Sequence, residues 1–240
     1  TSHSKPKYRL VIKKECDFMK KFLAATLIFA FILAGCQSTS ENNQDITIAN
    51  LSSKQGLAAY FAYSENIKNE QNLAEDATCL ASLNRSTDNE NGNLQVMVQV
   101  IQDRTEADVF SIKVAEPYND DYDVMRERAY EELDNETFPE LSSQVENIDS
   151  YDIVYVGTPV WSSSLPHPVA SFLSENDLTD KIIVPFGIHL GSGFGTIIEE
   201  IEELCPDSIV LDGFTINAST ANEEVKDEFE NWLDETLENE

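Results

Sequence analysis

Hydrophobic side chains gather along the chain in short continuous runs that are rich in Val, Ile, Tyr and Phe. Continuous apolar runs of this length are typical of parallel strands that are covered on both faces. We therefore expect five strands from about residue 56 onward. They are predicted at 57–63, 109–114, 153–156, 182–186 and 209–216, the last passing through 209–211 and 214–216.

The segments between these runs carry apolar residues at helical spacing. They are 93–104, 122–133, 167–173, 196–204 and 222–237. The last helix places Val225, Phe229, Trp232 and Leu233 on one stripe, and its opposite face is almost entirely acidic, which indicates solvent. Strands that alternate with helices predict an α/β fold, a doubly wound parallel sheet with helices on both faces.

One segment interrupts the alternation. A βα connection is usually two to six residues long, but a polar stretch from about residue 66 to residue 91 separates the first strand from its helix. We interpret it as an insertion in a domain that covers 56–240. Long connections of this kind are usually functional or disordered.

The beginning of the chain has the features of an export signal. Within 19–35, a short basic start precedes the apolar run FLAATLIFAFILA, which is too short to span a membrane. The run ends in Leu-Ala-Gly and then Cys36, which resembles the bacterial lipobox, so we expect Cys36 to be the lipidated first residue of the mature protein. The alternative is an ordinary secretory signal followed by a chance cysteine.

The residues around this signal also have predicted roles. Residues 1–18 do not fit a signal peptide, so we expect translation to start at Met19 and residues 1–18 to be untranslated. Residues 36–55 are rich in Ser, Asn and Gln, which is typical of a flexible tether. The protein would then lie on the extracytoplasmic face of a bacterial membrane.

Charge restricts the possible partners. The chain has a net charge of −28, and residues 36–240 carry 9 basic and 42 acidic residues, a net charge of −33. Such a chain does not bind nucleic acid, which requires basic patches, and does not adhere unaided to anionic lipid. Acyl chains must therefore provide the membrane anchor, and the charge favours a positively charged partner protein.

Ligands of open α/β sheets bind outside the carboxyl ends of the strands. The first of the three loops expected there contains Ser64 and Asn66, the second is rich in serine around Trp161, and the third, 187–195, is rich in glycine. Trp161 could be a loop anchor on the domain, but its serine-rich surroundings favour a ring that faces a ligand and not the core. The glycine-rich loop could also be a simple entry into the next helix.

These loops resemble those of the flavodoxins, and specifically of bacterial flavodoxin-like lipoproteins. The matching strings are YFAYSEN at 60–66, EPYNDDY at 116–122, DIVYVGTPVWSSSLPHP at 152–168 and KIIVPFGIHLGSGFG at 181–195. The resemblance implies a five-stranded parallel sheet in the order 2-1-3-4-5 and the cofactor FMN. It implies flavin contacts from Thr158, Pro159, Val160, Trp161, Ser162, His189, Gly191, Ser192, Gly193 and Phe194. His189 could equally be a solvated loop residue.

The first loop departs from the family pattern. The phosphate of FMN needs hydroxyl and N–H donors at a helix N-terminus, and the candidates are Ser64, Asn66, Thr78 and Ser82, among which the sequence does not decide. Glu65 lies inside this loop, and an acid beside a phosphate is unfavourable.

The second loop departs as well. A flavodoxin has a glycine near the flavin, but no glycine lies between Gly157 and Pro168 here, so we expect left-handed backbone to be disfavoured there. Cys79 and Cys205 could pair outside the cytoplasm, but the predicted topology places them near opposite ends of the sheet, and we expect free thiols.

The function that these features predict is a membrane-tethered, extracytoplasmic electron carrier that binds FMN and docks a positively charged redox partner. One alternative is an FMN-dependent reductase of quinones or similar acceptors. Another is a flavin-free binding module, because fold alone does not fix function.

Overall fold

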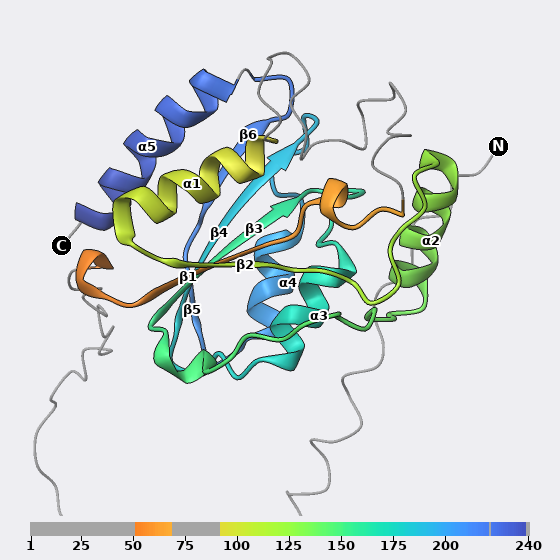
Figure 1. Cartoon of the computed structure of the whole chain (residues 1–240), viewed down its shortest axis with the longest axis horizontal. Coiled ribbons are helices and arrows are strands. Elements are labelled where there is room, and N and C mark those ends of the chain that lie inside the picture. The colour runs from red at the N-terminus through yellow and green to blue at the C-terminus, as the bar shows by residue number, and fades with distance from the viewer. Residues whose placement is uncertain (1–50, 69–91, 221, 239–240) are drawn as a thin grey trace, which may run out of the picture. The chain divides into compact units, whose positions relative to one another are not determined.

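The computed structural model describes residues 51–68, 92–220 and 222–238, which form a parallel sheet with helices on both faces (Figure 1). The strands are β1 Gly56–Tyr60, β2 Asp108–Ser111, β3 Ile153–Pro159, β4 Ile182–His189, β5 Ile209–Val210 and β6 Phe214–Asn217. Their order is β2-β1-β3-β4-β5, and β6 also pairs with β4. All these pairings are parallel, so the predicted order 2-1-3-4-5 is confirmed.

The fifth predicted strand is two strands. Val210 of β5 pairs with Ile183, and Phe214 of β6 pairs with Phe186, so the break lies opposite Pro185. Proline has no N–H to donate to a neighbouring strand. Gly213, which has a φ of 73°, turns the chain between the two short strands.

Five α-helices of the described chain lie within two residues of their predicted bounds. They are α1 Asn93–Thr105, α2 Tyr122–Asp134, α3 His167–Glu175, α4 Ile197–Leu204 and α5 Asn222–Glu238. α1 and α5 pack side by side on one face, and α3 and α4 lie on the other (Figure 1). Alternate residues of β3 point to opposite faces, so Val154 and Val156 belong to the core under α3 and α4, whereas Tyr155 belongs to the core under α1 and α5.

The folded domain begins earlier than the sequence predicts. Residues 51–53 form a 3-10 helix, and Leu51 is buried against the core that α5 covers. The carbonyl of Gln55 accepts hydrogen bonds from the backbone N–H groups of Asp152 (2.9 Å) and Ile153 (3.2 Å). Residues 51–55 are therefore part of the domain, and their assignment to the tether is wrong, because one buried leucine anchors them.

Several other sequence predictions fall outside the described residues. These are the upstream segment 1–18, the signal 19–35, Cys36, the tether as far as residue 50 and most of the insertion, 69–91. In the parts of the chain that the structure covers, none of the helices has the length and the apolar character that crossing a membrane requires.

Candidate functional site

Three loops meet at the carboxyl edge of the sheet. They follow β1 (residues 61–68), β3 (160–166) and β4 (190–196). The backbone N–H of Thr196 in the third loop donates to the carbonyl of Ser163 in the second at 2.9 Å. The second loop also contacts the first, because Trp161 lies against the rings of Phe61 and Tyr63. The sequence argument that these loops share one edge is therefore confirmed.

Trp161 lies on an aromatic bed. Its ring centroid is 5.3 Å from Phe61, 6.2 Å from Tyr63 and 5.5 Å from Tyr118, and each pair is close to edge-on. The expectation that this ring avoids the core is wrong. The serines beside it are polar and exposed, but Phe61, Tyr63 and Tyr118 supply an apolar surface that the indole covers.

The indole retains one unused group and one open side. Trp161 Nε1 is buried and has no hydrogen-bond partner among the described residues. A buried N–H without a partner is costly. The same side chain lines a pocket with other atoms of its ring.

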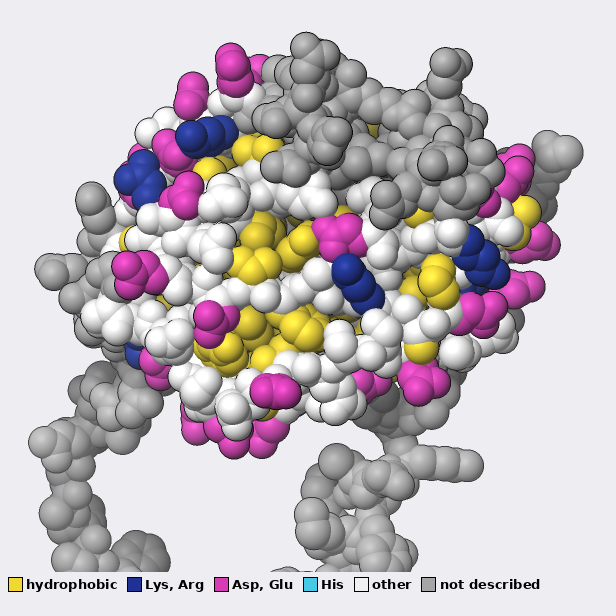
Figure 2. Space-filling model, in the orientation of Figure 1, with side chains coloured by type: hydrophobic (Ala, Val, Ile, Leu, Met, Phe, Trp, Pro, Cys, Tyr) yellow, Lys and Arg dark blue, Asp and Glu magenta, His cyan; other side chains and the backbone are white. Residues whose placement is uncertain are grey.

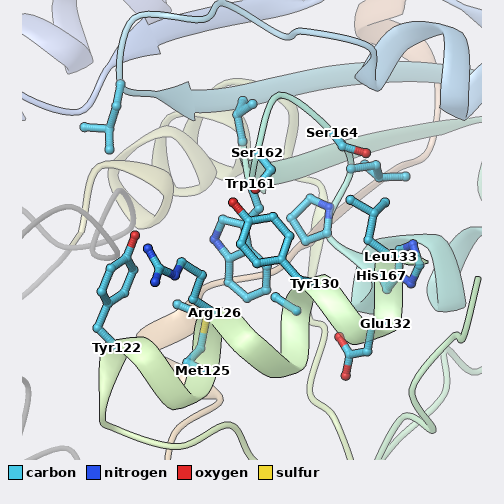
Figure 3. A pocket seen from close by; sticks show the side chains of 15 residues that line it. Tyr122, Met125, Arg126, Tyr130, Glu132, Leu133, Trp161, Ser162, Ser164 and His167 are labelled. Atoms are coloured by element: carbon cyan, nitrogen blue, oxygen red, sulfur yellow. The ribbon is translucent and has the colours of Figure 1, made fainter. Parts of the chain in front are cut away.

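This pocket, with a volume of about 200 Å³, lies between α2 and the loop after β3. Figure 3 shows Tyr122, Arg126 and Tyr130 extending from α2 toward the loop that carries Trp161. The loop contributes Val160, Trp161, Ser162, Ser164 and His167, and Leu190 comes from the loop after β4. Pockets that bind small ligands are typically apolar with a few placed polar groups, and this one has both.

Hydrogen-bond donors dominate the polar part of the lining. The guanidinium of Arg126 lies 5.3 Å from the ring centre of Tyr122 and 3.2 Å from Asp123. The carboxylate of Glu132 is already engaged, because it accepts from Arg128 Nε (2.8 Å) and from the hydroxyl of Tyr118 (2.6 Å). The pocket therefore suits a ligand that carries acceptors.

Tyr118 stays protonated in this arrangement. Burial, and then the nearby charge of Glu132, raise the pKa of the Tyr118 hydroxyl well above its usual value. The guanidinium of Arg128 lies 4.1 Å above the same ring. This packing holds the bed beneath Trp161 rigid.

The loop after β1 contains two of the predicted phosphate ligands. Ser64 Oγ is buried and has no hydrogen-bond partner in the part of the chain that the structure describes. The Asn66 side chain, in contrast, donates to the carbonyls of Ala62 (2.9 Å) and Ile112 (3.0 Å) and accepts from the N–H of Val114 (2.8 Å). Asn66 thus joins the loops after β1 and β2. Thr78 and Ser82 lie outside the described residues.

The carboxylate of Glu65 is held by three side-chain donors. Its carboxylate accepts from the hydroxyls of Tyr60 (2.6 Å) and Ser111 (2.5 Å) and from Gln95 Nε2 (2.8 Å). Lys113 Nζ is 3.8 Å away. These bonds hold its negative charge among β1, β2 and the first turn of α1, where the donors partly offset it.

The predicted residues of the other two loops separate into groups. Thr158 and Pro159 are the last two residues of β3 and are buried, whereas Val160 and Ser162 line the pocket. In the third loop Gly191 and Ser192 are exposed, and Gly193 and Phe194 are half-buried. The structure therefore brings Val160, Trp161 and Ser162 together on one pocket, with the third loop beside them.

His189 ends β4 and supports the glycine-rich loop. Its Nδ1 accepts a hydrogen bond from the backbone N–H of Gly191 at 2.8 Å. Burial lowers the pKa of the imidazole, so the ring is neutral near pH 7 with its proton on Nε2. The side chain therefore carries one donor, Nε2–H, and the structure does not place it among the residues that line the pocket.

The turn that follows Trp161 has an unexpected backbone. Ser162 and Ser163 have φ values of 52° and 63°, which is the left-handed region. The prediction that this loop avoids left-handed backbone for want of glycine is wrong. Gly195, which packs on the turn, leaves room for it: a Cβ there would lie 2.1 Å from the carbonyl oxygen of Ser163.

Sequence reasoning did not identify the wall that α2 provides. Tyr122, Arg126 and Tyr130 recur every four residues, so they share one face of that helix. The apolar face of this helix is otherwise sparse. The four-residue spacing of two aromatic rings and one cation is therefore the signal in the sequence that could have identified these three residues.

Comparison with known proteins agrees with this geometry. The model of a family described as "Flavodoxin" matches residues 89–235, more than half of the chain. The chain belongs to the flavodoxin family. None of the curated proteins compared with this flavodoxin matches it significantly.

Solved structures share the fold of this flavodoxin. Candidate flavoproteins from Bacteroides eggerthii and Bacteroides uniformis align with TM-scores of 0.53 and 0.54, at 22% and 18% identity. Each alignment covers 75% of this chain, and 96% and 98% of the respective neighbours. A flavoprotein from Lactobacillus acidophilus, solved in complex with FMN, aligns at 0.51 with 16% identity over 69% of this chain and 93% of its own.

Proposed function

We propose that this flavodoxin binds FMN with the flavin ring against Trp161, in the pocket walled by α2. The observation that carries the proposal is the pocket itself. It lies at the carboxyl edge of the sheet, and its wall combines hydrogen-bond donors with Trp161, whose ring packs on Tyr63 of the loop that carries Ser64. The FMN bound by the Lactobacillus neighbour supports the choice of ligand.

The residues fit the two ends of the cofactor. An isoalloxazine ring is flat, which suits the aromatic ring of Trp161, and it carries carbonyl and ring-nitrogen acceptors, which suit the guanidinium of Arg126. A phosphate needs donors, and the buried Ser64 Oγ has no partner among the described residues. When bound, FMN supplies the redox chemistry, and the protein binds, orients and tunes it.

We further propose that Cys36 carries a lipid anchor and that the domain works at the extracytoplasmic face of the membrane. The lipobox-like run before Cys36 and the polar residues after it support this proposal. A Cys36→Ser variant tests it: the variant should be released from membranes or stay unprocessed. A variant that remains membrane-bound at the wild-type mass contradicts the anchor.

The surface around the pocket suits a protein partner. Tyr130 and Leu190 line the pocket and are 45% and 54% exposed, and Phe138, whose ring packs on His167, is 42% exposed. Asp123, Glu127 and Glu131 of α2 are exposed as well. In the region of α2, Figure 2 shows hydrophobic side chains (yellow) beside acidic (magenta) and basic (dark blue) ones. Such a surface favours a partner with a basic border. Electron transfer to a basic protein should then slow as salt concentration rises.

A comparison of FMN with riboflavin tests the proposal and its placement. Both share the ring, but riboflavin lacks the phosphate, so FMN should bind more tightly, and Ser64→Ala should reduce that difference. Quenching of flavin fluorescence measures both affinities. Equal affinities would contradict a phosphate site at Ser64, and the absence of binding by either flavin would contradict the proposed function. An assay with a nicotinamide donor and a quinone separates the two functions: a reductase oxidises the donor catalytically, whereas an electron carrier does not.

A further inference from the structure

The turn that carries Trp161 is strained and is made without glycine. Trp161 and Ser164 exchange two backbone hydrogen bonds, of 2.9 and 3.3 Å, across a two-residue connection. Both connecting residues, Ser162 and Ser163, are left-handed. Turns of this kind prefer Asn and Gly, because a Cβ disfavours left-handed backbone. Contacts from outside the turn must therefore stabilise it.

The beginning of α4 supplies the first of these contacts. The carbonyl of Ser163 accepts from the backbone N–H of Thr196 at 2.9 Å, and Thr196 Oγ1 lies 3.0 Å from the same oxygen. Gly195 precedes this donor, and its missing side chain allows the close approach. The backbone at 195–196 thus packs directly against the turn.

Glu200, one helical turn further along α4, closes the arrangement. Its Oε1 accepts from Ser164 Oγ (2.7 Å) and lies 2.5 Å from Thr196 Oγ1, and its Oε2 accepts from the backbone N–H of Leu165 (2.8 Å). A carboxylate is acceptor-only, and its hydrogen bonds are about twice as strong as neutral ones. One side chain therefore ties the turn and the start of α4 together.

We propose that Glu200 is a positioning residue that fixes the orientation of Trp161 for the flavin. Glu200 does not line the pocket, as far as the described residues define it. It acts through the turn, because the indole extends from the first residue of that turn. The inference rests on the proposed function for its meaning, but the effect on Trp161 can be measured without flavin.

The test compares Glu200→Gln with Glu199→Gln. Both substitutions remove one charge from α4, but Glu199 is exposed and has no hydrogen bond to the turn. Glutamine keeps only one acceptor oxygen, so in Glu200→Gln the side chain can accept from Leu165 or from Ser164 but not from both. We expect the Kd for FMN to rise about tenfold in Glu200→Gln, as for the loss of one charged hydrogen bond, and to stay unchanged in Glu199→Gln.

Rescue of the Kd, corrected for the folded fraction by urea unfolding, separates positioning from a general loss of stability. Glycine adopts left-handed backbone without penalty, so adding Ser163→Gly to Glu200→Gln should restore the Kd to within about threefold of the wild type. A merely structural role for Glu200 would not be relieved by a glycine in the turn. Failure of this rescue therefore overturns the proposal.

A second readout needs no flavin. The chain has two tryptophans, so a Trp232→Phe background leaves Trp161 as the sole tryptophan reporter. In flavin-free protein, Glu200→Gln should shift the emission to longer wavelength as the indole becomes exposed, and Glu199→Gln should not. Identical emission in the two variants overturns the proposal. If the wild type binds no FMN, the proposed function fails, and this fluorescence comparison still decides the role of Glu200.

Discussion

Replacing Trp161 by alanine should affect both flavin affinity and folding, by amounts that the structure separates. The indole makes three nearly edge-on contacts, with Phe61, Tyr63 and Tyr118. Each such contact contributes about 0.5–1.5 kcal/mol beyond burial. Replacing a fully buried aromatic residue by alanine lowers the free energy of unfolding by about 3–5 kcal/mol. Because Trp161 is only half-buried, we expect a smaller loss of about 2–4 kcal/mol for Trp161→Ala.

The loss of affinity comes from the open side of the ring. Stacking of a flat base on an aromatic side chain is worth about 1–3 kcal/mol, so the Kd for FMN should rise roughly one to two decades in Trp161→Ala. Trp161→Phe should reduce both the flavin affinity and the free energy of unfolding by less than Trp161→Ala does. It keeps an aromatic ring, and the Nε1–H that it removes has no partner within the described residues.

The assay combines flavin fluorescence titration with urea unfolding at the same temperature, so that each Kd is corrected for the folded fraction. Trp232→Ala is the control. Trp232 packs against Phe229 (5.3 Å) and Phe214 (5.4 Å) in the core that α5 covers, on the other face of the sheet from Trp161. The Trp232→Ala variant should be less stable than the wild type and should keep its affinity for the flavin. If the corrected Kd of Trp161→Ala rises no more than that of Trp232→Ala, Trp161 is only an anchor and the flavin ring lies elsewhere.

Three other predictions follow from single residues. Ser163→Gly should raise the free energy of unfolding by about 0.5–1 kcal/mol, because relief of left-handed backbone outweighs the entropy that glycine adds; a decrease in urea unfolding would contradict the turn geometry. Asn66→Ala should lower it by about 2–4 kcal/mol, because three buried backbone groups lose their partners; an unchanged midpoint would show that water replaces them. His189 has a lowered pKa in the folded protein, so the unfolded chain binds more protons in mildly acidic solution, and stability should fall as pH falls through that range. His189→Asn should flatten this part of the pH profile, and an unchanged profile would assign the dependence to other groups.

The fold could be predicted because its signals are local. Continuous apolar runs and helical stripes located the strands and helices of the described chain, and alternation gave the fold class. The split of the last strand could not be predicted in this way, because Pro185 affects a neighbouring strand and not its own. Leu51 was missed because a single apolar residue within a polar segment carries no periodicity.

The candidate site could be predicted only in part. Chain order indicated which loops meet, but side-chain direction depends on partners that are distant in sequence. The carboxylate of Glu65 is held by Tyr60 and Ser111, and the side-chain amide of Asn66 bonds the backbone of Ile112 and Val114. These interactions span up to 48 residues, so no short motif records them.

The most direct test of the account is a visible absorption titration of the purified protein with FMN. We predict saturable binding of one FMN per chain, with a shifted and structured flavin band near its usual wavelength and quenched tryptophan emission that Trp161→Phe reduces. If the flavin band does not change and no FMN is retained after gel filtration, even at flavin concentrations well above those that saturate a specific site, the claim that this flavodoxin binds FMN is contradicted.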